Sequence, residues 1–287
     1  MNLKTILISS GSSGMRLGNY LRFLFPDMRE SDLRRLFSGR DVKLDGHPAS
    51  ADALLREGQE LKIYLPDREP PVLRVVYEDD NVLLVNKPSG VSVESDGTGG
   101  LSLTEICRIY GEEHGFSGTP SPCHRLDVKT CGLCLFAKND RALEILREAF
   151  RIRSVDKYYI CLVRGMMKPP AAVCNAYLLK DSEHGKVSVT DHPVPGAKPI
   201  STGYETIENG PVSRLKVHLI TGRTHQIRAH LSAMGHPILG DDVYGDRAFN
   251  RAHKARVLKL CAVSLTVRTN GQLPNLDGKT FSIDAPF

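Results

Sequence analysis

The chain has 287 residues, a hydrophobic fraction of 41% and a formal net charge of +5, from 38 Lys and Arg against 33 Asp and Glu. This length suits one large domain or two unequal ones, and the mild positive charge allows a nucleic-acid partner without requiring one. The cysteines are irregularly spaced and odd in number, and the chain has neither a signal-like N-terminus nor an apolar run of about 18 residues. These features exclude a disulfide scaffold and a membrane helix, and they predict a cytoplasmic protein with reduced thiols.

The clearest boundary in the chain lies at residues 66–71. Three prolines and three charged residues stand there within six positions, in the order Pro-Asp-Arg-Glu-Pro-Pro. Such a segment cannot continue a helix or a central strand. We therefore expect a small N-terminal domain over residues 1–70 and a larger domain over residues 71–287.

In the small domain, two sets of apolar residues recur at helical spacing and short strands follow. The first set predicts a helix and consists of Leu17, Tyr20, Leu21, Leu24 and Phe25. The second set predicts another helix and consists of Leu33, Leu36 and Phe37. Residues 42–44 alternate like a strand before a turn at Asp45-Gly46, and residues 59–64 predict the closing strand.

A longer motif runs through these elements. It consists of Arg16-Leu17, Ser31, Leu33-Arg34-Arg35-Leu36, the run from Gly39 to Gly46, Leu55, and Glu57-Gly58-Gln59. It resembles the S4 RNA-binding domain, which pairs two helices with a small sheet. The resemblance implies phosphate contacts from the basic side chains on the second helix and after it, which are Arg34, Arg35, Arg40 and Lys43. The alternative is a set of solvated surface charges, because residues 1–70 hold eleven Lys and Arg against ten Asp and Glu.

The larger domain mixes strands and helices without regular alternation. Strands are predicted at residues 75–77, 82–85, 132–137, 157–163 and 215–219. Helices are predicted at residues 103–113, 141–150 and 224–234. This order indicates an α+β domain with a mixed or antiparallel sheet.

One segment of this domain carries a candidate catalytic residue. Residues 123–133 read Cys-His-Arg-Leu-Asp-Val-Lys-Thr-Cys-Gly-Leu and contain Asp127 between basic residues and a glycine turn. An isolated aspartate in this setting could be a turn residue or a helix cap. The segment, however, resembles the His-Arg-Leu-Asp…Thr-Ser-Gly motif of the RluA-type pseudouridine synthases. It departs from that motif at Cys131, where serine is common, so we expect tolerance with loss of one local hydrogen bond.

Three further segments match this family in order and spacing. Residues 78–90 resemble its opening hairpin, residues 156–159 with Gly165 its Lys-x-Tyr strand, and residues 222–231 with 235–241 its C-terminal motif. The resemblance covers residues 75–287. It implies an isomerase that converts uridine to pseudouridine in structured RNA, without a metal or an organic cofactor.

The chemistry of this reaction suits the residues that the resemblance nominates. Isomerisation must break N1–C1′ of uridine, turn the free base and join C5 to C1′. A carboxylate can attack C1′ or assist loss of the neighbouring proton, and the resemblance assigns that role to Asp127. It assigns to Arg228 the charge partner that favours the ionised carboxylate, and to Tyr159 a place against the uracil ring. Stacking needs only the ring of Tyr159, whereas help in removing the C5 proton would need its hydroxyl.

The target uridine must leave its helix or loop to be reached, so base flipping is expected. The resemblance implies that Arg125 can fill the gap left by the flipped base. It also indicates that Arg223 and His225 are candidates for contacts with the RNA or the pocket. Purely structural interpretations of several residues in these segments stand beside the functional ones. His124 is expected to be a structural residue, Lys157 and Tyr158 to lie on a strand surface, and Tyr159 without its motif would be plain core.

Other interpretations are weaker. Cys131 and Cys134 form a Cys-x-x-Cys, but no second such pair exists, and His225 and His230 are five residues apart and do not share a helix face, so no metal site is expected. A non-catalytic RNA-binding or ribosome-assembly factor is the competing function, and the intact set of Asp127, Tyr159 and Arg228 favours the enzyme. By family analogy we expect large-subunit ribosomal RNA as the substrate, with transfer RNA as the alternative. We also expect a monomer.

Overall fold

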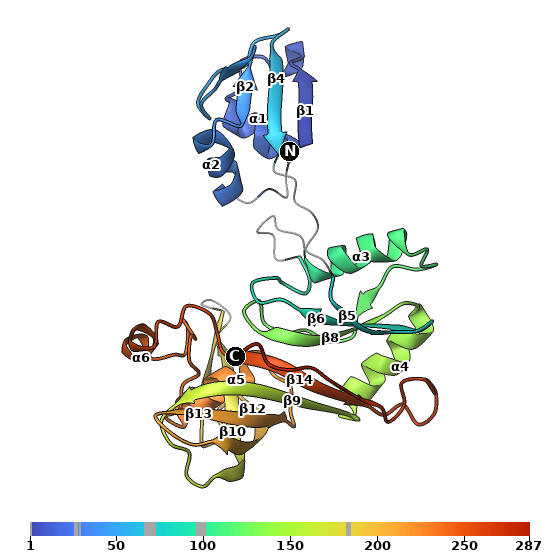
Figure 1. Ribbon diagram of the computed structural model, residues 1–287, viewed down its shortest axis with the longest axis vertical. Helices are drawn as coiled ribbons and strands as arrows, with labels where there is room; N and C mark the ends of the chain where they lie inside the picture. Colours follow the sequence, from blue (N-terminus) through green and yellow to red (C-terminus); the bar gives the residue numbers. More distant parts are fainter. Residues whose placement is uncertain (1, 26–27, 29, 66–72, 96–101, 182–184) are drawn as a thin grey trace. The chain divides into compact units, whose positions relative to one another are not determined.

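The computed structural model describes residues 2–25, 28, 30–65, 73–95, 102–181 and 185–287 (Figure 1). The chain divides into two compact units, Met1–Val72 with Glu94–Ser102 and Leu73–Val93 with Leu103–Phe287. Each unit has a hydrophobic core of its own. Among the described residues, no helix is long and apolar enough to cross a membrane.

The smaller unit packs two helices against a four-stranded antiparallel sheet of order β1-β4-β2-β3. Its elements are β1 (Asn2–Leu7), the 3-10 turn η1 (Ser10–Ser12), α1 (Leu17–Leu24), α2 (Glu30–Ser38), β2 (Val42–Leu44), β3 (His47–Pro48) and β4 (Glu60–Leu65). Leu17 and Leu21 of α1 and Leu33 and Leu36 of α2 are buried in one core with the inner face of the sheet. The two helices and the strands after them are confirmed, whereas β1 was not expected.

The larger unit is built on one sheet of order β11-β10-β12-β13-β9-β14-β8-β6-β5, with β15 beside β14 and β7 beside β8. Its strands are β5 (Val75–Glu78), β6 (Val82–Lys87), β7 (Ser121–Pro122), β8 (Cys131–Ala137), β9 (Val155–Arg164), β10 (Ala171–Asp181), β11 (Lys186–Thr190), β12 (Lys198–Glu208), β13 (Val212–Leu219), β14 (Leu260–Val267) and β15 (Thr280–Ser282). Strands β8 and β14 pair in parallel, and the other pairings are antiparallel. This mixed sheet confirms the expected α+β class.

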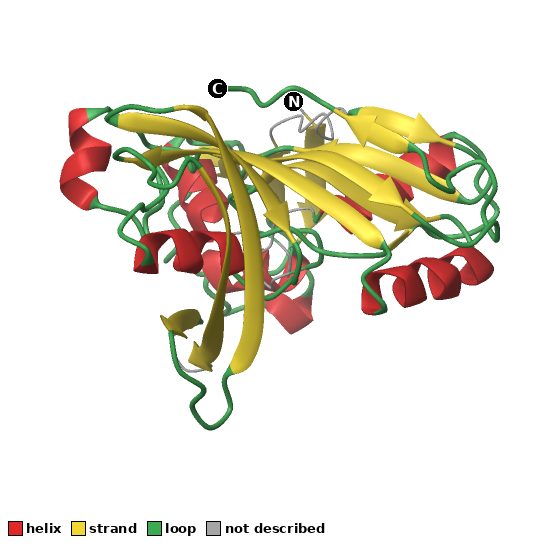
Figure 2. Cartoon of the chain, turned by 90° about the horizontal axis from the view of Figure 1, so that it is seen from below, coloured by secondary structure: helices red, strands yellow, loops and turns green. Residues whose placement is uncertain are grey.

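Helices cover both faces of this sheet (Figure 2). They are α3 (Leu103–Glu113), α4 (Asp140–Arg151), α5 (Gln226–Ala233) and α6 (Arg247–Ala252). Leu83 and Val85 share a core with α3 and α5, whereas Val82 and Leu84 share a core with α4. Because successive side chains of a strand point to opposite faces, coverage on both sides explains the unbroken apolar run of β6.

Two residues with positive φ, His225 and Gly132, determine where loops of the larger unit join its helices and strands. The helix expected over residues 224–234 begins at Gln226, because His225 adopts a left-handed conformation with φ 53°. Gly132 has φ 113° and pairs with Ala262 of β14, and a Cβ at Gly132 would stand 2.2 Å from the Ala262 carbonyl oxygen. Only glycine fits where β8 passes this close to β14. The glycine therefore fixes the point at which the Asp127 segment enters the sheet.

Candidate active site

Three separate elements bring the expected catalytic side chains together. Asp127 lies in the segment between β7 and β8, Tyr159 in β9 and Arg228 in α5. The Nη1 of Arg228 donates to Oδ2 of Asp127 at 3.0 Å. The arginine side chain is 4% exposed and that of Asp127 is 23% exposed. The site thus holds a carboxylate that is fixed by a buried guanidinium and that still reaches solvent.

Arg228 also binds a second carboxylate, on Asp241. Its Nε donates to Asp241 Oδ2 at 2.7 Å and its Nη2 to Asp241 Oδ1 at 3.0 Å, which is a bidentate fork. Oδ1 of Asp241 also accepts the backbone N–H groups of Val243 and Tyr244. Burial alone would disfavour the charge on Asp241, but Arg228 and these N–H groups hold its pKa below the ordinary value. Asp241 thus orients the arginine toward Asp127.

This role of Asp241 was not predicted from the sequence, where Asp241 was only the last residue of the C-terminal motif and is followed by a second aspartate, Asp242. The two differ in setting: the Asp241 side chain is fully buried, and that of Asp242 is 56% exposed and pairs with Lys129. The sequence signal that could have pointed to Asp241 is the Gly-Asp pair that ends the C-terminal motif. Gly240 has φ 80°, and a Cβ there would stand 2.0 Å from the Val257 carbonyl oxygen.

Lys87 anchors the segment that carries Asp127. This side chain is fully buried, and its Nζ donates to the carbonyl oxygens of Pro88 at 3.0 Å, Val91 at 2.6 Å and Val128 at 3.0 Å. Burial lowers the pKa of Lys87 to about 8. The N–H of Gly90 also donates to the Val128 oxygen at 2.8 Å. The segment at the end of β6 therefore holds Val128, the residue after Asp127, by two hydrogen bonds to its carbonyl oxygen, one from Lys87 and one from Gly90.

Tyr159 stands in the middle of the sheet, opposite Val217 of β13 and Ala262 of β14. It is 5% exposed, and no hydrogen bond joins its hydroxyl to another described residue. Burial, together with the charge of Asp127, raises the pKa of this hydroxyl well above its ordinary value. The Tyr159 hydroxyl is therefore protonated, and it lies close enough to Asp127 for the charge of that carboxylate to affect its pKa.

Among the expected RNA contacts in this unit, His225 lies close to the carboxylate. Its Nε2 lies 3.9 Å from Asp127 Oδ2, and its Nδ1 lies 2.9 Å from the hydroxyl oxygen of Tyr244. Burial lowers the pKa of His225. The charge of Asp127 raises this pKa, and that of Arg228 lowers it. Arg125 and Arg223 are exposed. They stand near the site in sequence and present their side chains to solvent.

The remaining candidates in this unit have structural settings. His124 accepts the Leu135 N–H at its Nε2 at 3.1 Å and stacks on Phe150, which confirms a structural histidine. Burial lowers its pKa to about 3. Cys131 donates from Sγ to the Leu260 carbonyl oxygen at 3.6 Å, so its hydrogen bond goes to β14. Cys134 is fully buried. Within the described ranges no group of three or more His, Cys, Asp or Glu could hold a metal ion.

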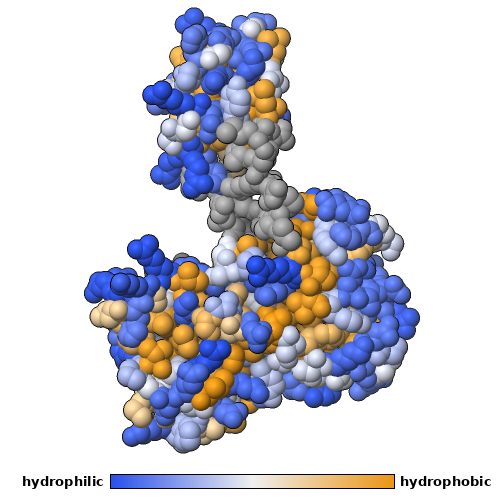
Figure 3. All heavy atoms as spheres, in the orientation of Figure 1, coloured by the Kyte–Doolittle hydropathy of each residue, from blue (hydrophilic) through white to orange (hydrophobic). Residues whose placement is uncertain are grey.

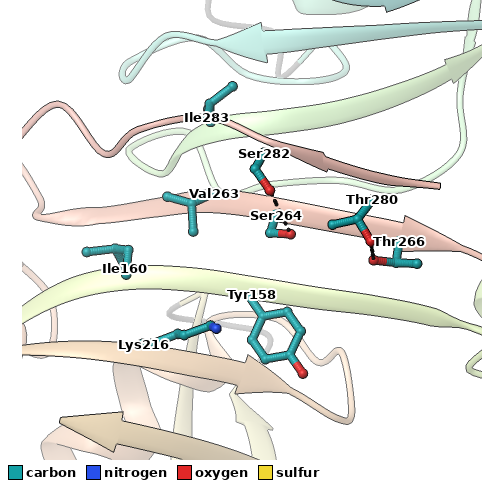
Figure 4. A pocket seen from close by; sticks show the side chains of 9 residues that line it. All are labelled: Tyr158, Ile160, Lys216, Val263, Ser264, Thr266, Thr280, Ser282 and Ile283. Carbon is teal, nitrogen blue, oxygen red and sulfur yellow. Dashed lines mark hydrogen bonds between the residues drawn. The ribbon is translucent and has the colours of Figure 1, made fainter. Parts of the chain in front are cut away.

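A pocket of about 440 Å³ opens on the other face of the sheet (Figure 4). It is lined from β9, β13, β14 and β15, with Tyr158, Lys216 and Ser264 among its side chains. Tyr158 stacks on His218 with ring centroids 4.6 Å apart. Because Tyr158 and Tyr159 are successive residues of β9, they face opposite sides of the sheet. This pocket therefore lies apart from the Asp127 site, and it contains none of the expected catalytic side chains.

The expected phosphate contacts of the smaller unit lie on and after α2. Arg34, Arg35 and Arg40 are exposed, and Lys43 is half-buried with its Nζ 5.0 Å from the centroid of the Tyr64 ring. The surface of this unit in Figure 3 is mainly hydrophilic. The four basic residues belong to this unit and the three expected catalytic residues to the larger one.

Comparisons with known proteins agree on one family. The family model described as RNA pseudouridylate synthase matches residues 81–233. The chain is 34% identical to "Ribosomal large subunit pseudouridine synthase C" of Vibrio vulnificus over 85% of this chain and 80% of that protein, and 31% identical to the Escherichia coli K12 protein of the same name over 87% and 82%. The solved structure of human RNA pseudouridylate synthase domain containing 4 superposes with a TM-score of 0.61, at 26% identity, over 74% of this chain and 88% of that one.

Proposed function

Because the chain belongs to the RNA pseudouridylate synthase family, we propose that it isomerises uridine to pseudouridine in large-subunit ribosomal RNA with Asp127 as the nucleophile. It is an isomerase by family. The observation that carries the assignment of the nucleophile is the 3.0 Å ion pair between Asp127 and the buried Arg228, beside Tyr159. The choice of ribosomal RNA is supported by the names of the two bacterial relatives.

The proposed reaction changes which uracil atom is joined to the ribose. Asp127 attacks C1′, or removes the proton on the neighbouring carbon, and the N1–C1′ bond breaks with its electron pair on the uracil. The freed base turns, and C5 forms the new bond to C1′ as the Asp127–C1′ bond breaks or, in the second route, as the proton returns to the neighbouring carbon. The C5 proton then leaves and N1 gains a proton, so the product has the composition of the substrate. A carboxylate suits either first step because it is ionised and can be released again.

The neighbours of Asp127 have matching tasks in this proposal. Arg228 gives the Asp127 carboxylate a buried partner of opposite charge, and Asp241 holds the guanidinium plane in position. The ring of Tyr159 supports the uracil, while its raised pKa keeps the hydroxyl protonated, so that the hydroxyl can donate a hydrogen bond. Arg125, Arg223 and His225 would contact RNA around the flipped nucleotide.

We further propose that residues 1–70 form an S4-like RNA clamp and that residues 71–287 form the catalytic domain. Two helices over a small sheet support this, as do the exposed side chains of Arg34, Arg35 and Arg40. Lys43, half-buried against Tyr64, would contribute a fourth contact. These residues would bind phosphates and so provide affinity without reading the sequence.

The direct test compares pseudouridine maps of total RNA from cells with and without the gene. The proposal expects one or more large-subunit ribosomal sites to disappear when the gene is absent and to return when it is restored. Loss of transfer RNA sites instead would reassign the substrate. Unchanged maps, together with no tritium release from C5 of labelled transcripts, would leave a non-catalytic RNA-binding factor.

A further inference from the structure

We propose that Tyr244 fixes the tautomer of His225 so that a neutral imidazole presents its Nε2–H to the target ribose beside Asp127. This inference rests on the proposed function and goes one step beyond it. It makes His225 a donor of defined geometry and Tyr244 its positioning residue.

The hydrogen bonds of the Tyr244 hydroxyl determine the tautomer. Its oxygen accepts the backbone N–H of Val187 in β11 at 2.9 Å, and that amide can only donate. The oxygen could accept a second hydrogen bond, but the single hydroxyl hydrogen also needs an acceptor. Among the described residues, the remaining hydrogen-bond partner of this hydroxyl is Nδ1 of His225, at 2.9 Å. A ring nitrogen that accepts carries no hydrogen, so the hydrogen of the neutral ring stands on Nε2.

The surroundings of His225 favour the neutral ring. Burial is the largest influence and lowers its pKa, Arg228 acts in the same direction, and Asp127 and Asp241 oppose it. The ring meets the Tyr244 ring edge-on, with centroids 5.6 Å apart and planes at 71°. The left-handed backbone of His225 turns the chain into α5 at this point. Tyr244 thus contacts the imidazole through both its hydroxyl and its ring.

The free N–H is aimed at the place where the reaction occurs. Nε2 lies 3.9 Å from Asp127 Oδ2, which is beyond hydrogen-bond distance. For Asp127 to act at C1′ or on the neighbouring proton, the ribose must lie against its carboxylate. A donor beside it then meets the hydroxyl group on C2′. Because that hydroxyl distinguishes RNA from DNA, His225 would contribute to sugar selectivity.

Tyr244 joins this donor to the arginine part of the site. Its backbone N–H donates to Asp241 Oδ1 at 3.0 Å, and its ring lies 5.2 Å from the guanidinium carbon of Arg228. The turn that orients Arg228 therefore also orients His225. One short segment after α5 sets both the charge partner and the neutral donor around Asp127.

The first experiment is nuclear magnetic resonance of the full chain labelled with ¹⁵N-histidine, in which long-range couplings assign the tautomer. The His225 ring of the wild type is expected as Nε2–H, and in Tyr244→Phe it should become a mixture of both tautomers. The control is Tyr204→Phe, which removes another tyrosine hydroxyl, one that donates to the Pro169 carbonyl oxygen at 2.9 Å. It should leave the His225 signals unchanged. An Nδ1–H ring in the wild type overturns the proposal.

The second experiment replaces the histidine by amides. In His225→Gln the amide nitrogen can stand where Nε2 stood, whereas in His225→Asn it stands near Nδ1. The proposal expects kcat to fall about tenfold less in the Gln variant than in the Asn variant, the value of one hydrogen bond in the transition state. Asparagine tolerates a positive φ better than glutamine. A purely structural role for His225 therefore predicts the opposite order, and that order would overturn the proposal.

The third experiment places 2′-deoxyuridine at the target position of an otherwise ribose substrate. The wild type should discriminate against it, and His225→Ala should lose about tenfold of that discrimination in kcat/KM. Equal discrimination by both proteins contradicts the contact. The tautomer measurement needs no turnover, so an absence of any pseudouridine formation would reject the proposed function, whereas an Nδ1–H ring in an active enzyme would reject this inference alone.

Discussion

The larger and smaller units both rely on arginine, but they place it in opposite settings. Arg228 is buried, and its guanidinium is held by ion pairs with Asp127 and Asp241. Arg34 and Arg35 lie exposed on α2. A buried guanidinium with two carboxylates holds one geometry, whereas an exposed one can adapt to a phosphate wherever RNA offers it. Single substitutions should therefore have large effects in the first setting and small ones in the second.

Arg228→Met is expected to have the largest effect. It leaves the buried Asp241 carboxylate and the Asp127 carboxylate without their charge partner, so the free energy of unfolding should fall by about 3–5 kcal/mol. The rate of pseudouridine formation should fall about a thousandfold or more. Urea unfolding and initial rates measure the two effects.

The matched control is Arg268→Met. Arg268 pairs with Asp156 at 2.7 Å, but its side chain is 54% exposed, so its loss should cost below about 1 kcal/mol. Equal costs for the two variants would contradict the contrast between a buried and an exposed arginine.

Gly132→Ala should destabilise the larger unit by about 2–4 kcal/mol. The added Cβ meets the backbone of Ala262 and also stands at a positive φ. Gly235→Ala is the control, because Gly235 has φ 86° but open space around the added atom. It should cost about 1 kcal/mol from the backbone alone. Thermal unfolding of the two variants separates the clash from the conformational penalty, and identical shifts would mean that β8 and β14 can move apart.

Lys87→Met should cost about 2 kcal/mol, because three carbonyl oxygens each lose the hydrogen bond that Lys87 donates. This cost should depend on pH. In the folded chain the pKa of Lys87 is about 8, below its ordinary value of 10.5, so between these values the unfolded chain holds a proton that the folded chain has released. The contribution of Lys87 to stability therefore rises with pH across that window. Urea unfolding at pH 7 and pH 10 should show the larger cost at pH 10, and a cost that shrinks on raising the pH would contradict the lowered pKa.

Much of the fold and part of the site could be predicted from the sequence. The helices predicted at residues 103–113 and 141–150 are confirmed by α3 and α4. They could be predicted because each helix buries one apolar face. Strands β10 and β12 were missed. Their residues are half-exposed, and β12 carries Pro199, Ser201 and Thr202, so their pairing depends on neighbouring strands rather than on local propensity.

The site shows the same division between local and long-range information. Asp127, Tyr159 and Arg228 could be named because each stands in a recognisable segment, and the structure brings them together. Asp241 ended such a segment and Tyr244 followed it, but nothing local distinguished a buried ion-pair partner from a turn residue. Their roles depend on hydrogen bonds to Arg228 and His225, which only the fold creates.

Arg34→Ala and Arg35→Ala should have the smallest effects. Each is expected to change the free energy of unfolding by less than about 0.5 kcal/mol, because both side chains are exposed. Each should weaken binding to the RNA substrate and reduce the slope of log K against log salt by about 1, with kcat unchanged. Binding measured across a salt series tests this, and an unchanged slope would assign these arginines to the solvated surface.

The central claim is that Asp127 performs the chemistry, and single-turnover tritium release from RNA labelled at C5 of uridine tests it most directly. Asp127→Asn should bind the RNA as tightly as the wild type and release no tritium. Asp242→Asn, which removes an exposed carboxylate in the same unit, should release it at the wild-type rate. Tritium release by the Asp127→Asn protein would contradict the account.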